Sequence, residues 1–235
     1  MSALREERRR RLAEAGVYLV TEERLSAGRH SEEVALAALD AGVGVLQVRE
    51  KEGSARRALE VARALRAETR RRGALLLVND RVDIALAVEA DGVHVGQDDL
   101  PVAEVRRLLG PDALIGLSIT APEQLRAADV AEADYLGVGA IFPTDGKSDA
   151  ILTGLGLLTA ARAATERPIV AIGGITTERV PVVLRAGADA VAVITAVTLA
   201  EDPGKAARDL LAAITAARAA AGRDGGAGDP SGARS

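Results

Sequence analysis

The chain of 235 residues has no cysteine and almost no aromatic residues. Without thiols it can form no disulfide, no thiolate metal site and no cysteine nucleophile. Two tyrosines and one phenylalanine make up the aromatic 1%. No row of rings is therefore available to stack on the bases of a single-stranded nucleic acid, and the core must be aliphatic.

The sequence also lacks a basic surplus and a long apolar run. The net charge is −4, which does not match a protein that binds phosphate backbones. No apolar run reaches the roughly 18 residues of a membrane helix, and the charged segment 1–16 has no apolar signal core. We expect a soluble cytoplasmic protein with neither nucleic-acid nor membrane partners.

What the sequence does have is a regular alternation of short apolar runs with helical patterns. Eight runs rich in Val, Ile and Leu read as strands covered by helices on both faces. They span residues 17–21, 44–49, 74–79, 91–95, 113–118, 134–139, 168–173 and 189–194. Helical patterns between them span residues 31–42, 54–73, 101–110, 121–133 and 177–187.

Strands that alternate with helices predict a parallel sheet, and eight units in this length predict a closed (β/α)₈ TIM barrel. An open, doubly wound sheet is the alternative. One barrel domain should cover residues 1–222 and begin with an extra helix at residues 2–15. The Gly- and Ser-rich segment 223–235 is predicted to be a disordered tail. Ser31 and Ser54 are predicted helix N-caps.

Polar residues gather where the predicted strands end, which is the edge that carries the active site of such barrels. Gln47, Arg49 and Lys51 alternate and therefore point to one face. Asn79 ends the third strand, and Lys147 follows the sixth. Cations and amides of this kind suit the oxygens of a diphosphate.

Two carboxylates follow neighbouring strands beside this cationic cluster. Asp80 and Asp99 lie one β/α unit apart. Either one alone could simply cap a helix. Together, beside cations, they favour Mg²⁺, which takes one or two carboxylates and fills its shell with water and substrate phosphate oxygens.

Glycine-rich loops after the last two strands predict a second anion site. Residues 171–175 contain Gly173 and Gly174, and residues 193–197 follow the eighth strand. Barrels often bind a monophosphate there on backbone N–H groups, although each loop alone could be a tight turn. A diphosphate, a monophosphate and Mg²⁺ in one site suggest a transfer reaction in which diphosphate leaves. No Ser/His/Asp arrangement is visible, and His94 is expected to be a bonded neighbour of the site, not its base.

Six motifs in this order resemble the thiamine phosphate synthase family over roughly residues 17–197. They are QVREK at 47–51, NDR at 79–81, DGVHVGQDDLP at 91–101, GLS at 116–118, IFPT…K at 141–147 and PIVAIGGI at 168–175. The resemblance implies a Mg²⁺-dependent, dissociative condensation. The diphosphate ester of 4-amino-5-hydroxymethyl-2-methylpyrimidine would condense with a methylthiazole phosphate, or with the carboxylated form of this thiazole phosphate. The products would be thiamine phosphate and pyrophosphate.

The resemblance also implies roles for individual residues. The pyrimidine diphosphate would be held by Gln47, Val48, Arg49, Glu50, Lys51, Asn79, Ser118 and Lys147. The thiazole phosphate would be held by Thr144, Asp145, Gly146, Gly174, Ile194 and Thr195. One Mg²⁺ would bind Asp80 and Asp99, and Arg49, Lys51 and Lys147 would stabilise the departing diphosphate.

Three positions depart from the family pattern. Gly146 stands where a threonine is usual, Thr195 replaces a serine, and Ala140 replaces a common proline. Two alternatives remain: a thiazole tautomerase-like isomerase, and a non-catalytic barrel that binds phosphorylated ligands. The retained diphosphate residues argue against the first, and only Gly146 favours the second. The sequence leaves the oligomeric state open, a homo-oligomer included.

Overall fold

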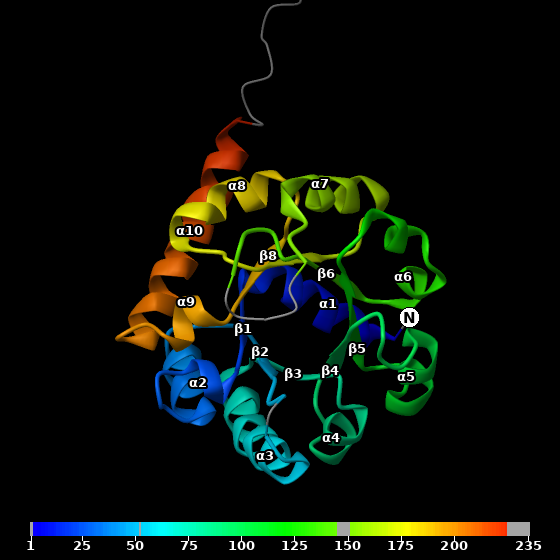
Figure 1. The fold of residues 1–235 in the computed structure, drawn as a ribbon, viewed down its shortest axis with the longest axis vertical. Helices are drawn as coiled ribbons and strands as arrows, with labels where there is room; N and C mark the ends of the chain where they lie inside the picture. The colour runs from blue at the N-terminus through cyan, green and yellow to red at the C-terminus, as the bar shows by residue number, and fades with distance from the viewer. Residues whose placement is uncertain (1, 52, 145–150, 225–235) are drawn as a thin grey trace, which may run out of the picture.

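Eight parallel strands close into a barrel in the computed structural model, which describes residues 2–51, 53–144 and 151–224 (Figure 1). Each strand pairs with the next, and β8 pairs with β1. The strands are β1 (Val17–Val20), β2 (Val45–Val48), β3 (Leu75–Asn79), β4 (Gly92–Val95), β5 (Leu114–Ile119), β6 (Tyr135–Val138), β7 (Ile169–Ile172) and β8 (Ala190–Val193). The predicted barrel is confirmed, and the open sheet is wrong.

Helices surround this barrel. They are α1 (Ala3–Ala15), η1 (Glu23–Leu25), α2 (Ser31–Asp40), α3 (Ala55–Arg72), α4 (Val82–Ala87), α5 (Val102–Leu109), η2 (Pro122–Arg126), α6 (Ala128–Glu132), α7 (Gly154–Ala164), η3 (Thr177–Arg179), α8 (Val180–Arg185), α9 (Thr195–Thr198) and α10 (Pro203–Asp224). The predicted helix at 121–133 is two short pieces, η2 and α6. Helices α4, α7 and α10 were not among the predicted segments. Residues 225–235, most of the predicted tail, lie outside the described residues.

Side chains alternate along each strand between two hydrophobic cores. In β1, Tyr18 and Val20 face the barrel interior, whereas Val17 and Leu19 pack against the surrounding helices. This alternation follows from the two-residue period of a strand. Both cores are aliphatic except for the two buried tyrosines, Tyr18 and Tyr135, which lie inside the barrel.

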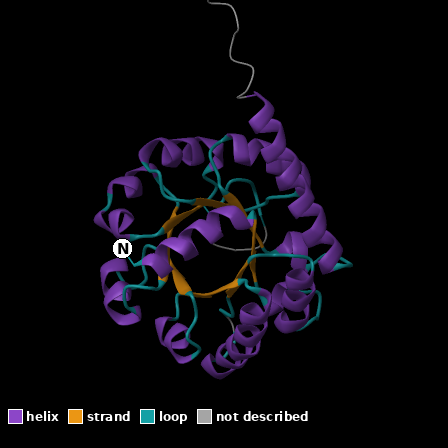
Figure 2. Cartoon of the chain, turned by 180° about the vertical axis from the view of Figure 1, so that it is seen from behind, coloured by secondary structure: helices purple, strands orange, loops and turns teal. Residues whose placement is uncertain are grey.

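Helix α1 closes the bottom of the barrel, where the strands begin. Figure 2, seen from that side, shows the N-terminal helix lying across the ring of strands. Ser2 caps the helix by accepting the N–H of Arg5 at 3.2 Å. Leu12 is fully buried and packs with the residues inside the barrel. The predicted extra helix therefore closes the end of the barrel that is opposite the carboxyl ends of the strands.

Three buried or half-buried aspartates tie the strands together at this closed end. Each one precedes an even-numbered strand and accepts the backbone N–H of the preceding odd-numbered strand: Asp91 from Leu76 at 2.9 Å, Asp134 from Ile115 at 2.8 Å and Asp189 from Ile169 at 2.8 Å. Arginines from the helices neutralise all three carboxylates. The same device thus fixes strand pairs around the barrel.

One predicted helix cap is confirmed and one is wrong. Ser54 caps α3 by accepting the N–H of Arg57 at 3.1 Å. Ser31 is the first residue of α2, and His30 occupies the N-cap position. The Ser31 hydroxyl donates instead to the Glu50 carboxylate, because the two segments lie side by side.

We predict that Asp134→Ala lowers the free energy of unfolding by about 3 kcal/mol. Its carboxylate is 1% exposed, pairs with Arg5 and Arg106, and accepts the Ile115 N–H. Its loss leaves two cations and a strand N–H without their acceptor. Urea denaturation measures the change. The control Asp112→Ala removes an exposed carboxylate nearby and should stay within about 0.5 kcal/mol. Equal stability of both variants would contradict the role of Asp134.

Candidate active site

The second strand delivers an amide and a guanidinium into the open end of the barrel. Gln47 and Arg49 are buried, with 4% and 6% exposure. They face inward, whereas Leu46 and Val48 pack in the outer core. Lys51 follows the strand and is exposed. The predicted alternation therefore places the first two groups inside the barrel mouth and the third at its rim.

Arg49 has a buried carboxylate partner that sequence reasoning missed. Its guanidinium forms an ion pair with Glu22, which follows β1 and is 3% exposed. Within the described residues, Arg49 Nε is buried without a hydrogen-bond partner. Glu22 lies 27 positions away in the sequence, and no local pattern marks the pair.

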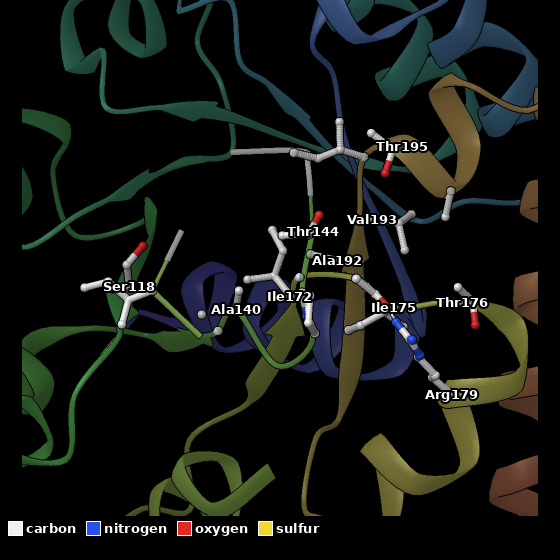
Figure 3. A pocket seen from close by; sticks show the side chains of 18 of the residues that line it. Ser118, Ala140, Thr144, Ile172, Ile175, Thr176, Arg179, Ala192, Val193 and Thr195 are labelled. Carbon is white, nitrogen blue, oxygen red and sulfur yellow. Dashed lines mark hydrogen bonds between the residues drawn. The ribbon is translucent and has the colours of Figure 1, made fainter. Parts of the chain in front are cut away.

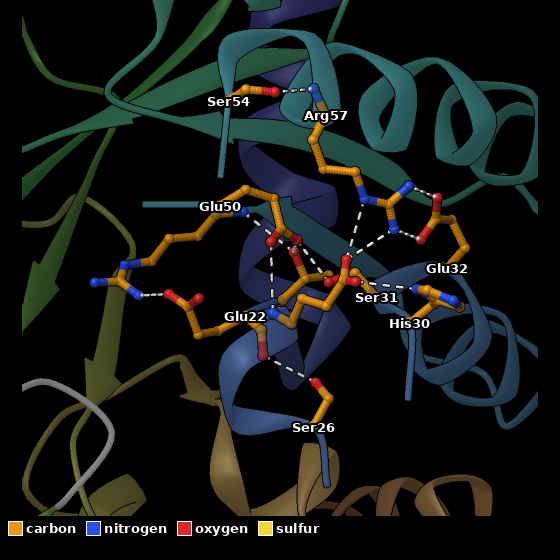
Figure 4. Close-up of polar contacts among 11 residues, drawn as sticks. Glu22, Ser26, His30, Ser31, Glu32, Glu50, Ser54 and Arg57 are labelled. Carbon is orange, nitrogen blue, oxygen red and sulfur yellow. Dashed lines mark hydrogen bonds and ion pairs between the residues drawn. The ribbon is translucent and has the colours of Figure 1, made fainter. Parts of the chain in front are cut away.

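The side chains of two predicted substrate contacts point elsewhere. Val48 packs between the barrel and the helices. The Glu50 carboxylate accepts hydrogen bonds from Ser31 and Thr21 and lies toward α2, as Figure 4 shows. Only the backbone of these two residues is available to a ligand in the mouth.

Asp80 and Asp99 follow neighbouring strands on the same side of the barrel. Asp80 has a left-handed backbone, φ 57°, and its N–H bonds to the His94 carbonyl at 2.9 Å. Asp99 is exposed and accepts the Gly96 N–H at 2.7 Å through one carboxylate oxygen. No cluster of three metal-binding side chains occurs in the described part of the chain. Two carboxylates suit Mg²⁺, which completes its shell with water and phosphate oxygens.

The loops after β6, β7 and β8 enclose a cavity of about 480 Å³, hereafter the loop cavity (Figure 3). Its volume lies within the range of small-molecule sites. Five predicted site residues line it: Ser118, Thr144, Gly174, Ile194 and Thr195. Ala140 lies in the same wall. Asp145, Gly146 and Lys147 lie outside the described residues.

A close backbone approach requires the glycine that follows β7. Gly174 has φ 60°, and a Cβ at that position would lie 2.4 Å from the Pro143 carbonyl oxygen. Any side chain there would push the β6 loop away from the β7 loop. The two loops can therefore enclose the cavity only with glycine at this position.

Arg179 brings a cation into the loop cavity that the sequence analysis did not single out. It comes from the turn before α8, stacks on the Phe142 ring at 4.5 Å and donates to the Gly174 carbonyl (Figure 3). It lies five residues beyond the glycine loop, within a segment predicted as an ordinary helix. In the sequence, Arg179 is a single arginine near the start of a predicted helix, and such an arginine usually faces solvent.

Below the mouth, six polar side chains from six strands form a continuous hydrogen-bonded series, hereafter the floor chain. Its members, in order of contact, are Asn79, Gln47, Tyr18, Tyr135, His94 and Ser118. They border a small cavity of about 30 Å³, room for little more than a water molecule. As predicted, His94 is a bonded neighbour of the site. Ser118, Gly137, Ile172 and Ala192 line both cavities, so the two adjoin.

Two glycines create the space for two rings of the floor chain, those of Tyr135 and His94. A Cβ on Gly116 would lie 2.1 Å from Tyr135 Cζ and 2.4 Å from His94 Nδ1. A Cβ on Gly137 would lie 2.7 Å from His94 Cε1. Both glycines face the barrel interior on strands next to these rings. The floor chain therefore depends on the absence of side chains at these positions.

Fold and site together define a class of protein. A closed barrel with a glycine-lined loop cavity and with cations and carboxylates at the same strand ends has the architecture of a TIM-barrel enzyme that acts on small molecules. Within the described residues, no helix is both long and apolar enough to cross a membrane.

Comparisons with known proteins narrow this class to one family. The model of the thiamine monophosphate synthase family matches residues 17–197. The thiamine-phosphate synthase of Natronomonas pharaonis is 50% identical over 202 residues, 85% of this chain and 94% of the relative. That of Moorella thermoacetica is 49% identical over 203 residues, 86% and 97% of the two chains. The chain therefore belongs to the thiamine monophosphate synthase family, and it is an enzyme of thiamine biosynthesis.

Solved structures agree with this assignment. The thiamine phosphate pyrophosphorylase of Pyrococcus furiosus superposes with a TM-score of 0.80 at 38% identity, covering 88% of this chain and 98% of its own. The (S)-3-O-geranylgeranylglyceryl phosphate synthase of Thermoplasma acidophilum has a TM-score of 0.65 at 14% identity, covering 91% and 98%. This second likeness is one of fold alone.

We predict that Gly116→Ala destabilises the protein by about 1 to 3 kcal/mol, because the added methyl overlaps the Tyr135 and His94 rings. Gly156→Ala is the control. This glycine lies inside α7, and no atom lies within 4 Å of the position that a Cβ would take, so alanine should stabilise the protein by about 0.5 to 1 kcal/mol. Thermal unfolding of both variants measures the contrast. A stable Gly116→Ala protein would contradict the packing of the floor.

Proposed function

We propose that this enzyme joins the diphosphate ester of 4-amino-5-hydroxymethyl-2-methylpyrimidine to a methylthiazole phosphate. The bond between the methylene carbon and the diphosphate oxygen breaks, and the electron pair leaves with diphosphate. The thiazole nitrogen donates its lone pair to the resulting pyrimidinylmethyl cation, which gives thiamine phosphate. The loop cavity and the polar barrel mouth beside it support this proposal, because a condensation needs two phosphorylated substrates side by side.

The diphosphate would lie at the mouth above the floor chain. Arg49, which borders the small cavity, and Lys51 would stabilise the charge that grows on the leaving oxygen. Lys147, which lies outside the described residues, would add a third cation. Val48 and Glu50 would contribute backbone atoms only.

Asp80 and Asp99 would hold one Mg²⁺ beside these cations. The bound metal would neutralise charge on the diphosphate. One oxygen of Asp99 is already bonded to the Gly96 N–H, which leaves the second oxygen for the metal. This arrangement supports a metal held jointly by protein and substrate.

The thiazole phosphate would occupy the loop cavity. Gly174, Ile194 and Thr195 would offer backbone N–H groups, and Thr144 a hydroxyl. Asp145 and Gly146 would complete this set, with the Gly146 N–H in place of the usual threonine hydroxyl. The absence of cysteine supports a cytoplasmic location, and a homo-oligomer is an additional proposal.

An assay with both substrates, with and without Mg²⁺, tests this function. We expect pyrophosphate and thiamine phosphate to form together, and only with the metal. Asp80→Asn should lower kcat/KM by about 100-fold or more, whereas Asp83→Asn, an exposed carboxylate paired with Arg81, is the control and should retain activity. Isomerised thiazole phosphate without pyrophosphate release would identify a tautomerase. Binding without turnover would identify a non-catalytic barrel.

We predict that Arg179→Gln raises KM for the thiazole phosphate about tenfold, because it removes a charged donor from the loop cavity. KM for the pyrimidine diphosphate should stay nearly constant, since Arg179 does not border the floor. Steady-state kinetics with each substrate varied in turn measure both constants. Arg185→Gln is the control, because this arginine is the last residue of the following helix, α8, is exposed and does not line the loop cavity. An equal rise of both constants would contradict the assignment of Arg179.

A further inference from the structure

The floor chain joins residues that lie far apart in the sequence through short contacts. Gln47 Nε2 donates to Asn79 Oδ1 at 2.7 Å, and the Tyr18 hydroxyl donates to Gln47 Oε1 at 2.7 Å. The Tyr18 and Tyr135 hydroxyl oxygens lie 3.0 Å apart. His94 contacts the Tyr135 hydroxyl through Nδ1 and the Ser118 hydroxyl through Nε2, both at 2.9 Å.

With the Gln47 amide oxygen facing Tyr18, as the structure places it, and a neutral His94, these contacts run in one direction. Gln47 Oε1 can only accept, so the single hydroxyl proton of Tyr18 points to it. The Tyr18 oxygen must then accept from Tyr135, whose own proton is used in that bond. His94 Nδ1 must therefore carry a proton and donate to Tyr135. In a neutral imidazole Nε2 is then an acceptor, and Ser118 donates to it.

Both tyrosines keep the protons that this direction requires. Burial raises the pKa of Tyr18 and of Tyr135 well above the ordinary value of a phenol. The two ends of the chain then differ. Within the described residues, the Asn79 amide nitrogen and the second N–H of Gln47 have no acceptor, so this end offers donors. The Ser118 hydroxyl donates its hydrogen bond to His94, so its oxygen is available only as an acceptor.

We propose that Tyr18, Tyr135 and His94 are positioning residues that fix this polarity and thereby select the substrate ring. The floor recognises a heteroaromatic ring with an acceptor nitrogen toward Gln47 and Asn79 and an amino donor toward Ser118. This inference rests on the proposed function, because a 4-aminopyrimidine carries that pair on one edge. The 4-oxo analogue carries a ring N–H and a carbonyl instead, which inverts the pattern.

The tautomer of His94 tests the polarity without any turnover. The chain has two histidines, and His30 is exposed, so His30→Gln leaves a single imidazole to observe. Long-range ¹H–¹⁵N correlation of the ¹⁵N-histidine protein, recorded well above the ordinary imidazole pKa of about 6.5, reports which nitrogen holds the proton. We expect Nδ1–H with Nε2 unprotonated. The opposite tautomer would reverse every bond and overturn the proposal.

Tyr135→Phe tests whether the polarity is set through the chain. This variant removes one hydroxyl and keeps the ring that fills the floor. His94 Nδ1 then loses its acceptor, and we expect the proton to move to Nε2, where Ser118 can accept it. Thr69→Val is the control, because it removes a buried hydroxyl that bonds to the Arg66 carbonyl far from the floor. An unchanged His94 tautomer in Tyr135→Phe would overturn the proposal.

Substrate selection provides the second readout. The unmodified enzyme should prefer the 4-amino pyrimidine diphosphate over its 4-oxo analogue by on the order of 100-fold or more in kcat/KM. Tyr135→Phe should reduce this preference at least tenfold and leave KM for the thiazole phosphate unchanged, whereas Thr69→Val should alter neither. Equal loss of activity on both pyrimidines would indicate a merely structural role and overturn the proposal.

The two readouts separate the failure of this inference from the failure of the proposed function. If neither pyrimidine is turned over, the proposed function fails, and the His94 tautomer still decides the polarity. If thiamine phosphate forms but His94 carries its proton on Nε2, the function stands and the inference fails. Circular dichroism of Tyr135→Phe checks its fold, and the tautomer in the unmodified floor decides the polarity should that variant not fold.

Discussion

The limited space inside an eight-stranded barrel determines what its floor can contain. Half of the residues on every strand point inward, and in most such barrels branched aliphatic side chains fill this volume. Here two tyrosines and a histidine share it, and Gly116 and Gly137 leave room for two of these rings, Tyr135 and His94. These two rings replace aliphatic side chains because the positions that face them are glycine. The aromatic residues that are so scarce in this chain are therefore concentrated where their polar ends can meet.

Two parts of the fold provide two kinds of recognition. Side chains on strands form the floor chain. Each strand is hydrogen-bonded to the strand on either side, and this pairing holds a donor or an acceptor side chain in a fixed direction. Loops after β6, β7 and β8 form the larger cavity, where backbone N–H groups can approach a phosphate. At the opposite end, α1 and the aspartates before β4, β6 and β8 fix the strand ends. The floor chain and the loops of the larger cavity are thus carried by the same strands, which are fixed at their other end.

The alternation of apolar runs with helical patterns was enough to predict the barrel. The polar residues at the carboxyl ends of the predicted strands were enough to predict its open mouth. All eight strands were located, because each is a local apolar run, and Gln47 and Arg49 face inward as alternation requires. Contacts between distant segments could not be predicted in this way. Glu22 meets Arg49 across 27 positions and Tyr18 meets Tyr135 across 117, with no repeat to mark either pair. Ser31 likewise failed as a cap because Glu50, on another segment, binds its hydroxyl.

The ion pair between Glu22 and Arg49 changes how the mouth can bind an anion. An unpaired buried guanidinium would cost several kcal/mol, and Glu22 offsets that cost. The same carboxylate repels a diphosphate that approaches Arg49. The diphosphate site proposed above combines two described cations, Arg49 and Lys51, with three carboxylates, Glu22, Asp80 and Asp99, so these five side chains carry a formal charge of −1. A diphosphate therefore needs further positive charge to bind there, which a divalent cation held by Asp80 and Asp99 would supply. On this electrostatic argument, metal and diphosphate should bind together, with each increasing the affinity for the other.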